Sequence, residues 1–162
     1  MRFCTKGIFT AVLAGVIFSV IVSCVFGSVK MEGVFMEPSI RDGSIVFINK
    51  LAYFYQEPEP GDIVTFNCNV YSEDGEGSIL VRRIAATGGD RVRITDGNLY
   101  VNDQIYADSP ENRIYLDQMD EITIEDGRVF VMSDTFTAVL DSRNQAVGQL
   151  RTDELDGKVC FR

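Results

Sequence analysis

The sequence contains no histidine. Catalysis by Ser-His-Asp or Cys-His groups therefore has no imidazole base, and imidazole-bound zinc and histidine proton shuttles are excluded as well. Any acid-base chemistry must use lysine, carboxylate, tyrosine or cysteine side chains.

A CxxC pair is also missing, because the four cysteines are isolated from one another: Cys4, Cys24, Cys68 and Cys160. Neither a zinc site nor a thioredoxin-like motif is indicated, and we expect no metal and no cofactor. Cys68 and Cys160 would be able to pair in an oxidising compartment, although the sequence does not show that they meet.

The chain has no surplus of basic residues, since its formal net charge is -9. Phosphate binding needs a basic surface, so nucleic acid is not expected as a partner. Internal repeats and low-complexity segments are absent from the sequence. With 46% apolar residues among 162, the chain is able to form one domain with a core plus a short extra element.

Residues 7–29, the uncharged segment, are apolar or small throughout. A helix of this length is able to cross a hydrocarbon core of about 30 Å. Arg2 and Lys6 precede it, so the positive-inside bias keeps that end in the cytoplasm. We therefore predict a cytoplasmic end (residues 1–6), a transmembrane anchor (7–29) and an extracytoplasmic domain (30–162), in a single-pass protein of the plasma membrane.

Two alternatives exist for this segment. A cleaved secretory signal has an apolar region of about 7–15 residues, which is shorter than this one. A lipoprotein signal would acylate Cys24, but residues 25–29 remain mostly apolar where a polar linker is normal.

Beyond Lys30 the pattern changes to short β-rich runs separated by turn residues. Asp96-Gly97 predicts a hairpin turn. No amphipathic helix of three turns is evident, so the domain is expected to be mainly β, as a barrel or as coiled sheets. The predicted strands cover residues 44–48, 63–66, 79–81, 91–94, 99–101, 104–106, 127–132 and 157–161. The aromatic run at residues 53–55 would either pack in the core or lie at a membrane interface or in a groove.

Several short motifs follow the uncharged segment in a fixed order. They are Gly33-x-x-Met36-Glu37-Pro38-Ser39-Ile40, Gly43, Gly61-Asp62-Ile63-Val64, Arg82-Arg83-Ile84, Gly89-Asp90-Arg91-Val92, Asp134 and Asp141-Ser142-Arg143. Each motif alone is weak, but the ordered set resembles type I signal peptidases along essentially the whole chain. The resemblance implies a mostly β fold with a groove at the outer membrane surface, where a serine attacks a signal peptide and a lysine is the base.

The resemblance places the nucleophilic serine at Phe35 and the general-base lysine at Arg82. A benzyl side chain has no nucleophilic atom, and a guanidinium stays protonated in proteins, so neither residue can do the family's chemistry. Phe35 would either pack at the membrane edge or over the groove floor, or fill the site and leave a groove without chemistry.

Further departures lie near the C-terminal end. The family's Gly-Asp-Asn-Arg is here Ser133-Asp134-Thr135-Phe136, and a serine that often assists the lysine falls at Val139. The nearest hydroxyl to Phe35 in the sequence is Ser39, for which a turn hydrogen bond is the simpler role. A new dyad of Ser39 with Lys50 or Lys30 is the catalytic alternative. Asp141, Ser142 and Arg143 are expected to form a structural cluster.

These features favour a membrane-anchored, non-catalytic homologue that binds extended peptides by strand addition. Its expected partners are exported preproteins or pilin-type subunits, in an assembly step that is sortase-linked by analogy with degenerate family members. An active signal peptidase with relocated catalytic residues is the alternative, and a lipid-anchored surface protein that only uses the fold is a third hypothesis.

Overall fold

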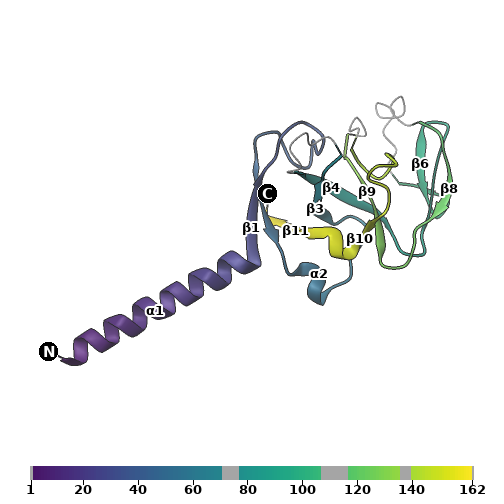
Figure 1. Cartoon of the computed structure of the whole chain (residues 1–162). Coiled ribbons are helices and arrows are strands. Elements are labelled where there is room, and N and C mark those ends of the chain that lie inside the picture. Colours follow the sequence, from purple (N-terminus) through teal and green to yellow (C-terminus); the bar gives the residue numbers. More distant parts are fainter. Residues whose placement is uncertain (1, 71–76, 107–116, 136–139, 162) are drawn as a thin grey trace.

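The computed structural model describes residues 2–70, 77–106, 117–135 and 140–161, without the side chains of residues 2–10, 21 and 161. Helix α1 (Arg2–Val25) extends away from the strands as one rod (Figure 1). Strand β1 (Phe26–Lys30) follows at once, so residues 26–29 of the uncharged segment belong to a sheet. They do so because β1 pairs along its whole length with β2 (Ile45–Asn49). In the described part of the chain, no helix has both the length and the apolar character of a membrane span.

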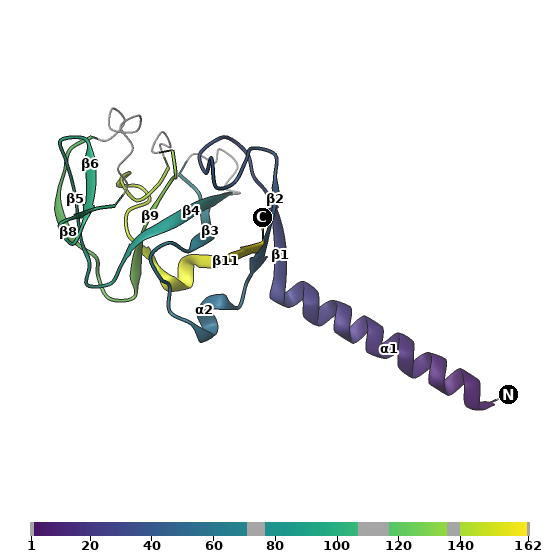
Figure 2. The same ribbon diagram turned by 180° about the vertical axis from the view of Figure 1, so that it is seen from behind.

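Two antiparallel sheets form the rest of the molecule, and Figure 2 shows the smaller one on the side away from α1. The larger sheet has the order β1-β2-β11-β3-β4-β9-β10. Its remaining strands are β3 (Ile63–Cys68), β4 (Ser78–Thr87), β9 (Arg128–Met132), β10 (Leu150–Arg151) and β11 (Leu155–Phe161). The smaller sheet, of order β7-β6-β5-β8, contains β5 (Arg91–Thr95), β6 (Asn98–Val101), β7 (Gln104–Ile105) and β8 (Met119–Thr123).

The prediction of a mainly β domain is confirmed, with two open sheets in place of a closed barrel among the described residues. The turn between β5 and β6 has positive φ at Asp96 (51°) and Gly97 (69°), as the predicted hairpin requires. Outside α1, helical structure in the described chain is limited to the single turns α2 (Ala52–Tyr55) and η2 (Thr152–Glu154).

The apolar core lies in three clusters that β4 links. One packs the small sheet against β4 and β9, through residues such as Ala86, Leu99 and Phe130. A second lies on β3, β4 and β9 around Phe66. The third joins β2 to the residues that follow β1, including Met36. Because β4 contributes to all three, its side chains are held firmly in place.

The two cysteines considered for a disulfide are free, with Cys68 buried and Cys160 exposed. The register explains their separation. Strands β3 and β11 pair Phe66 with Leu155 and Val64 with Lys158, so the two cysteines lie at opposite ends of the pair.

Of the aromatic run at residues 53–55, the predicted packing in the core applies to Tyr53. The Tyr53 hydroxyl donates a hydrogen bond to Asp62 Oδ2 (3.1 Å), and its ring packs against the core. Phe54 and Tyr55 remain 79% and 77% exposed.

Candidate functional site

The segment after β1 is folded back on itself by its own backbone. The Glu37 amide donates to Val34 O, and the Ile40 amide donates to Met36 O. Met36 and Ile40 are buried in the third core cluster, where they fix the segment beneath β4. This anchoring determines where the aromatic ring of Phe35 lies.

Gly33 makes room for that ring. Its backbone has φ of +85°, a conformation that side chains disfavour, and a Cβ there would lie 2.7 Å from Phe35 Cε2. Asp42 Oδ1 accepts a hydrogen bond from the Gly33 amide (2.8 Å), which stabilises the turn. The glycine of the motif therefore has a steric role beside Phe35.

Phe35 and Arg82, the two positions expected to carry the chemistry, are in contact. The Arg82 Cζ atom lies 5.5 Å from the centroid of the Phe35 ring, which is a cation–π distance. The Phe35 carbonyl accepts hydrogen bonds from the amides of Asp134 (3.0 Å) and Thr135 (3.2 Å). The resemblance thus predicts the location of a shared site, although its residues lack the expected atoms.

Arg82 is 3% exposed. Its Nε donates to Leu140 O (2.9 Å) and its Nη1 donates to Val81 O (2.6 Å). Burial lowers the pKa of Arg82, an effect that the Asp141 charge opposes. Because arginine starts far above neutral pH, the guanidinium stays protonated and cannot serve as a base.

Arg83, the next residue of β4, is bound quite differently. Its Nε and Nη2 donate to the two oxygens of Asp134, both at 2.8 Å. Nη2 also donates to Ser39 Oγ (2.8 Å), and Nη1 donates to Gly61 O (2.9 Å). The hydrogen bond that Arg83 donates to Asp134 raises the pKa of Arg83. The bidentate pair ties β4 to the segment after β9, and the hydrogen bond to Ser39 adds the segment after β1.

A second buried ion pair lies close by. Arg143 donates to both oxygens of Asp141, from Nε at 2.9 Å and from Nη2 at 2.7 Å. Asp141 is 1% exposed and also accepts long hydrogen bonds from Ser133. Ser142 Oγ accepts the Val131 amide (2.8 Å), which holds this segment against β9. The predicted structural cluster is therefore present.

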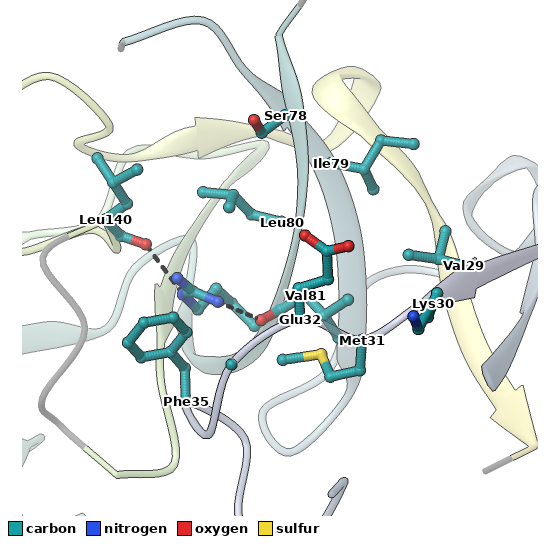
Figure 3. A pocket seen from close by; sticks show the side chains of 12 residues that line it. Val29, Lys30, Met31, Glu32, Phe35, Ser78, Ile79, Leu80, Val81 and Leu140 are labelled. Carbon is teal, nitrogen blue, oxygen red and sulfur yellow. Dashed lines mark hydrogen bonds between the residues drawn. The ribbon is translucent and has the colours of Figure 1, made fainter. Parts of the chain in front are cut away.

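A groove of about 910 Å³ opens beside Phe35 and Arg82. Figure 3 shows Phe35 and Leu140 on one side of it and Val29, Lys30 and Ile79 on the other. The dashed lines in Figure 3 mark the Arg82 hydrogen bonds to the carbonyls of Leu140 and Val81. The groove is lined by Val29, Lys30, Met31, Glu32, Gly33, Phe35, Ser78, Ile79, Leu80, Val81, Arg82 and Leu140.

The lining comes from two strands and their extensions. Residues 78–82 of β4 pair on one side with β3, while β9 pairs with β4 only from Arg83 onward. Strand β1 is the terminal strand of its sheet in the described chain and pairs with β2. Among the described residues, β1 and the 78–82 part of β4 therefore each have one edge that no other strand pairs with.

The predicted site residues divide into groups. Gly33, Phe35 and Arg82 line the groove, whereas Met36 is in the core and Pro38 is exposed. Ser39, Arg83 and Asp134 form one cluster, and Asp141 and Arg143 form another with Ser142 beside them.

The relocated dyad is not supported by the contacts of Ser39. The group in contact with Ser39 Oγ is the Arg83 guanidinium, which cannot accept a proton. Lys30 lies in the groove, whereas the Lys50 amide donates to Val25 O at the end of α1. Val139 and Phe136, two further predicted positions, lie outside the described residues.

Sequence reasoning missed much of the groove wall, including Glu32, Ile79, Leu80 and Leu140. Alternation along a strand predicts which residues share a face, but it does not indicate that β9 ends opposite Arg83. Leu140 contributes through its carbonyl oxygen, for which a sequence carries no signal.

Known proteins resemble this chain along nearly its whole length. Residues 4–162 match the family described as signal peptidase, peptidase S26. The chain is 31% identical to thylakoidal processing peptidase 1 of Arabidopsis thaliana, over 97% of this chain and 46% of that protein. It is 29% identical to signal peptidase I of Bacillus caldolyticus, over 85% of this chain and 79% of that protein.

A crystal structure of signal peptidase I from Enterococcus faecalis superposes with a TM-score of 0.51 at 20% identity, covering 65% of this chain and 98% of that one. That likeness concerns the fold alone. The chain spans less than half the length of the thylakoidal peptidase it matches. The family match and the sequence identities place the chain in the S26 signal peptidase family.

Proposed function

We propose that this member of the S26 family binds an extended peptide segment in the groove and does not cleave it. The observation that carries the proposal is the contact between Phe35 and Arg82, at 5.5 Å, where the family resemblance expects a serine and a lysine. Both substitutions meet in one place, so the loss of the nucleophile and the loss of the base concern a single site.

The chemistry of the two residues supports a binding role. Peptide cleavage by a serine needs a hydroxyl and a neighbour that takes its proton. Phe35 offers neither, and Arg82 is protonated and held by two carbonyl oxygens. Ser39 Oγ accepts a hydrogen bond from the Arg83 guanidinium, and that cation cannot take the proton of the serine.

The edges of β1 and β4 support an extended ligand. A strand edge presents backbone N–H and C=O groups that a peptide is able to pair with, and side-chain pockets then give preference for particular residues. The walls also contain Met31, Ile79 and Leu80, so the favoured peptide is apolar at alternate positions.

The partners remain as the sequence predicts them: exported preproteins or pilin-type subunits, in an assembly step that is sortase-linked. The plasma-membrane anchor, with the N-terminus in the cytoplasm, is likewise part of the proposal. Its support is the uncharged segment preceded by Arg2 and Lys6. Alkaline extraction of membranes from expressing cells tests it, because a protein released into the soluble fraction would contradict the anchor.

Peptide binding is tested with matched variants of two exposed isoleucines. Ile79, in the groove, is 50% exposed, and Ile105, on β7, is 45% exposed. We expect Ile79→Arg to weaken the binding of a labelled apolar peptide to the full chain by about tenfold, whereas Ile105→Arg leaves it unchanged. Equal effects of the two changes would contradict the groove as the binding site.

The alternative is an active peptidase with relocated catalytic residues. Its support is the likeness to proteins named as processing peptidases and signal peptidases. A preprotein incubated with the full chain decides between the two. We expect no cleavage, whereas cleavage that Ser39→Ala abolishes would establish the alternative. Cleavage that appears only in the Phe35→Ser, Arg82→Lys double variant would support the binding role.

The third hypothesis, a lipid-anchored surface protein, depends on Cys24, whose side chain is exposed near the end of α1. The mass of the mature protein tests it directly. An acylated N-terminal Cys24 would replace the proposed anchor, and an intact Met1 would exclude this hypothesis.

A further inference from the structure

Three buried or half-buried arginines lie within the candidate site, and their partners differ. Arg83 and Arg143 each form a bidentate pair with an aspartate, at 2.8 Å to Asp134 and 2.7 Å to Asp141. Among the described residues, no carboxylate is within ion-pair distance of Arg82, which is the most buried of the three. Its two hydrogen bonds go to neutral carbonyl oxygens.

A buried cation without a contacting anion is unusual, because removing a charge from water is costly unless an opposite charge compensates. The nearby Asp141 does not compensate through contact, since its oxygens are occupied by Arg143 and Ser133. The Phe35 ring contributes a cation–π contact, which is weaker than a buried ion pair.

The Nη2 atom of Arg82 is a donor that remains available to a ligand. Nε and Nη1 donate to Leu140 O and Val81 O, while no described atom accepts a hydrogen bond from Nη2. Arg82 lines the groove, so a ligand there is able to reach this donor. The other charged residues of the lining are Lys30 and Glu32, and Glu32 is exposed without an ion pair to Arg82.

We propose that Arg82 receives a carboxylate of the bound peptide, at the end of the groove that Phe35 and Leu140 border. This inference rests on the proposed peptide-binding function and specifies its ligand. The carboxylate forms an ion pair with the guanidinium, for which the described residues provide none. Its source is either the C-terminus of a peptide that ends at Arg82 or an acidic side chain of a longer segment.

Three versions of one peptide distinguish these sources. A fluorescein-labelled peptide of about eight valine, threonine and alanine residues is prepared with a free C-terminal carboxylate and as the C-terminal amide. The third version is the amide with aspartate as its last residue. Binding to the full chain is measured by fluorescence anisotropy. We expect the free acid to bind about tenfold more tightly than the plain amide.

The response of the aspartate-containing amide assigns the source: tight binding supports a side-chain carboxylate as well, and weak binding supports the C-terminus alone. Equal binding of the free acid and the plain amide would overturn the carboxylate inference while leaving the peptide-binding function intact. If none of the three peptides binds, both the inference and the proposed function fail.

Variants of Arg82 test whether this residue causes the difference in affinity between the free acid and the plain amide. We expect Arg82→Gln to abolish the preference for the free acid and Arg82→Lys to retain part of it, because lysine keeps the charge. Arg91→Gln, the same change at an arginine that is 48% exposed on β5, should leave the preference unchanged. Circular dichroism verifies that each variant is folded. A preference that persists in folded Arg82→Gln would contradict the inference, and if that variant does not fold, the Arg82→Lys result decides alone.

Discussion

Arg82 and Arg83 are neighbours on one strand, yet they belong to two different regions. Side chains of consecutive strand residues point to opposite faces, so Arg83 enters the cluster of Asp134 and Ser39 while Arg82 faces Phe35 and the groove. In the first region Arg83 is paired with Asp134, and in the separate Asp141 cluster Arg143 is paired with Asp141. At the groove, the buried Arg82 contacts no carboxylate of the described residues.

This difference indicates that the paired arginines stabilise the fold, whereas Arg82 is the arginine for which we propose a ligand. Bidentate pairs that join segments distant in sequence stabilise the framework, because breaking them leaves a buried charge uncompensated. Arg82 contributes no such pair among the described residues, which is why we propose a ligand carboxylate for it. The framework motifs thus surround Phe35 and Arg82, where the family resemblance expects a serine and a lysine.

The largest effect on the framework is expected from Asp141→Ala. The change leaves Arg143 without its bidentate partner beneath β9, where the Asp141 carboxylate is 1% exposed. We expect a loss of about 3–5 kcal/mol in the free energy of unfolding. Urea denaturation measures it, with Asp103→Ala as the control, because that aspartate is 55% exposed and should matter by about 1 kcal/mol or less. A similar loss for both variants would contradict the importance of burial.

Arg82 and Arg83 are compared directly by replacing each with methionine. Arg83→Met leaves Asp134, which is 12% exposed, without its partner, and we expect a loss of about 3 kcal/mol. Arg82→Met removes a buried cation that contacts no described carboxylate, but it also removes the donor to the Leu140 and Val81 carbonyls. We therefore expect a smaller loss of about 1 kcal/mol. Thermal unfolding of the two variants tests the contrast. If Arg82→Met proved as costly as Arg83→Met, Arg82 would be part of the framework.

The sequence predicts the framework better than the groove. The β runs, the Asp96-Gly97 turn and the cluster at Asp141 depend on alternation, turn chemistry and charge, which are local signals. The predicted anchor wrongly includes most of strand β1, because an apolar strand next to an apolar helix differs little from it in composition.

The groove is less predictable because it arises from pairings between distant segments. Its open edge exists because β9 meets β4 only from Arg83 onward. The Asp141 carboxylate pairs with Arg143 and does not pair with Arg82. The order of the motifs nevertheless locates Phe35 and Arg82 in one site. The family resemblance is therefore enough to predict that Phe35 and Arg82 lie in contact.

A smaller effect is expected where the turn after β1 supports the Phe35 ring. Gly33 and Gly43 both have positive φ, at +85° and +75°, but a Cβ added at Gly33 would meet the Phe35 ring, whereas one added at Gly43 would have no neighbour within 4 Å. We expect Gly43→Ala to cost about 1 kcal/mol from backbone strain, and Gly33→Ala about 2 kcal/mol in total.

A double-mutant cycle separates the steric part of that loss. In a Phe35→Ala background the two glycine substitutions should become equally costly, because the ring no longer meets the added Cβ. Chemical denaturation of the four variants measures this. A difference between Gly33→Ala and Gly43→Ala that survives the removal of Phe35 would mean that the ring does not press on Gly33.

The smallest effect at neutral pH is expected from Tyr106, which links the smaller sheet electrostatically to the Arg83 cluster. Burial raises the pKa of Tyr106 to about 12, while the Arg83 charge acts in the lowering direction and Asp134 in the raising direction. Below the unfolded pKa of about 10, both states keep the proton, so Tyr106→Phe should leave the pH dependence of stability unchanged there. Above it, the unfolded chain releases the proton first, and stability falls as pH rises toward about 12. The free energy of unfolding should therefore decline less steeply over this alkaline range in Tyr106→Phe than in the wild type.

The two arginine variants should differ over the same alkaline range. Arg83→Met should make the decline in the free energy of unfolding steeper, because it removes the charge that favours the Tyr106 phenolate. Arg82→Met should leave the decline unchanged. Equal slopes in the two variants would show that Tyr106 does not distinguish the charge of Arg83 from that of Arg82.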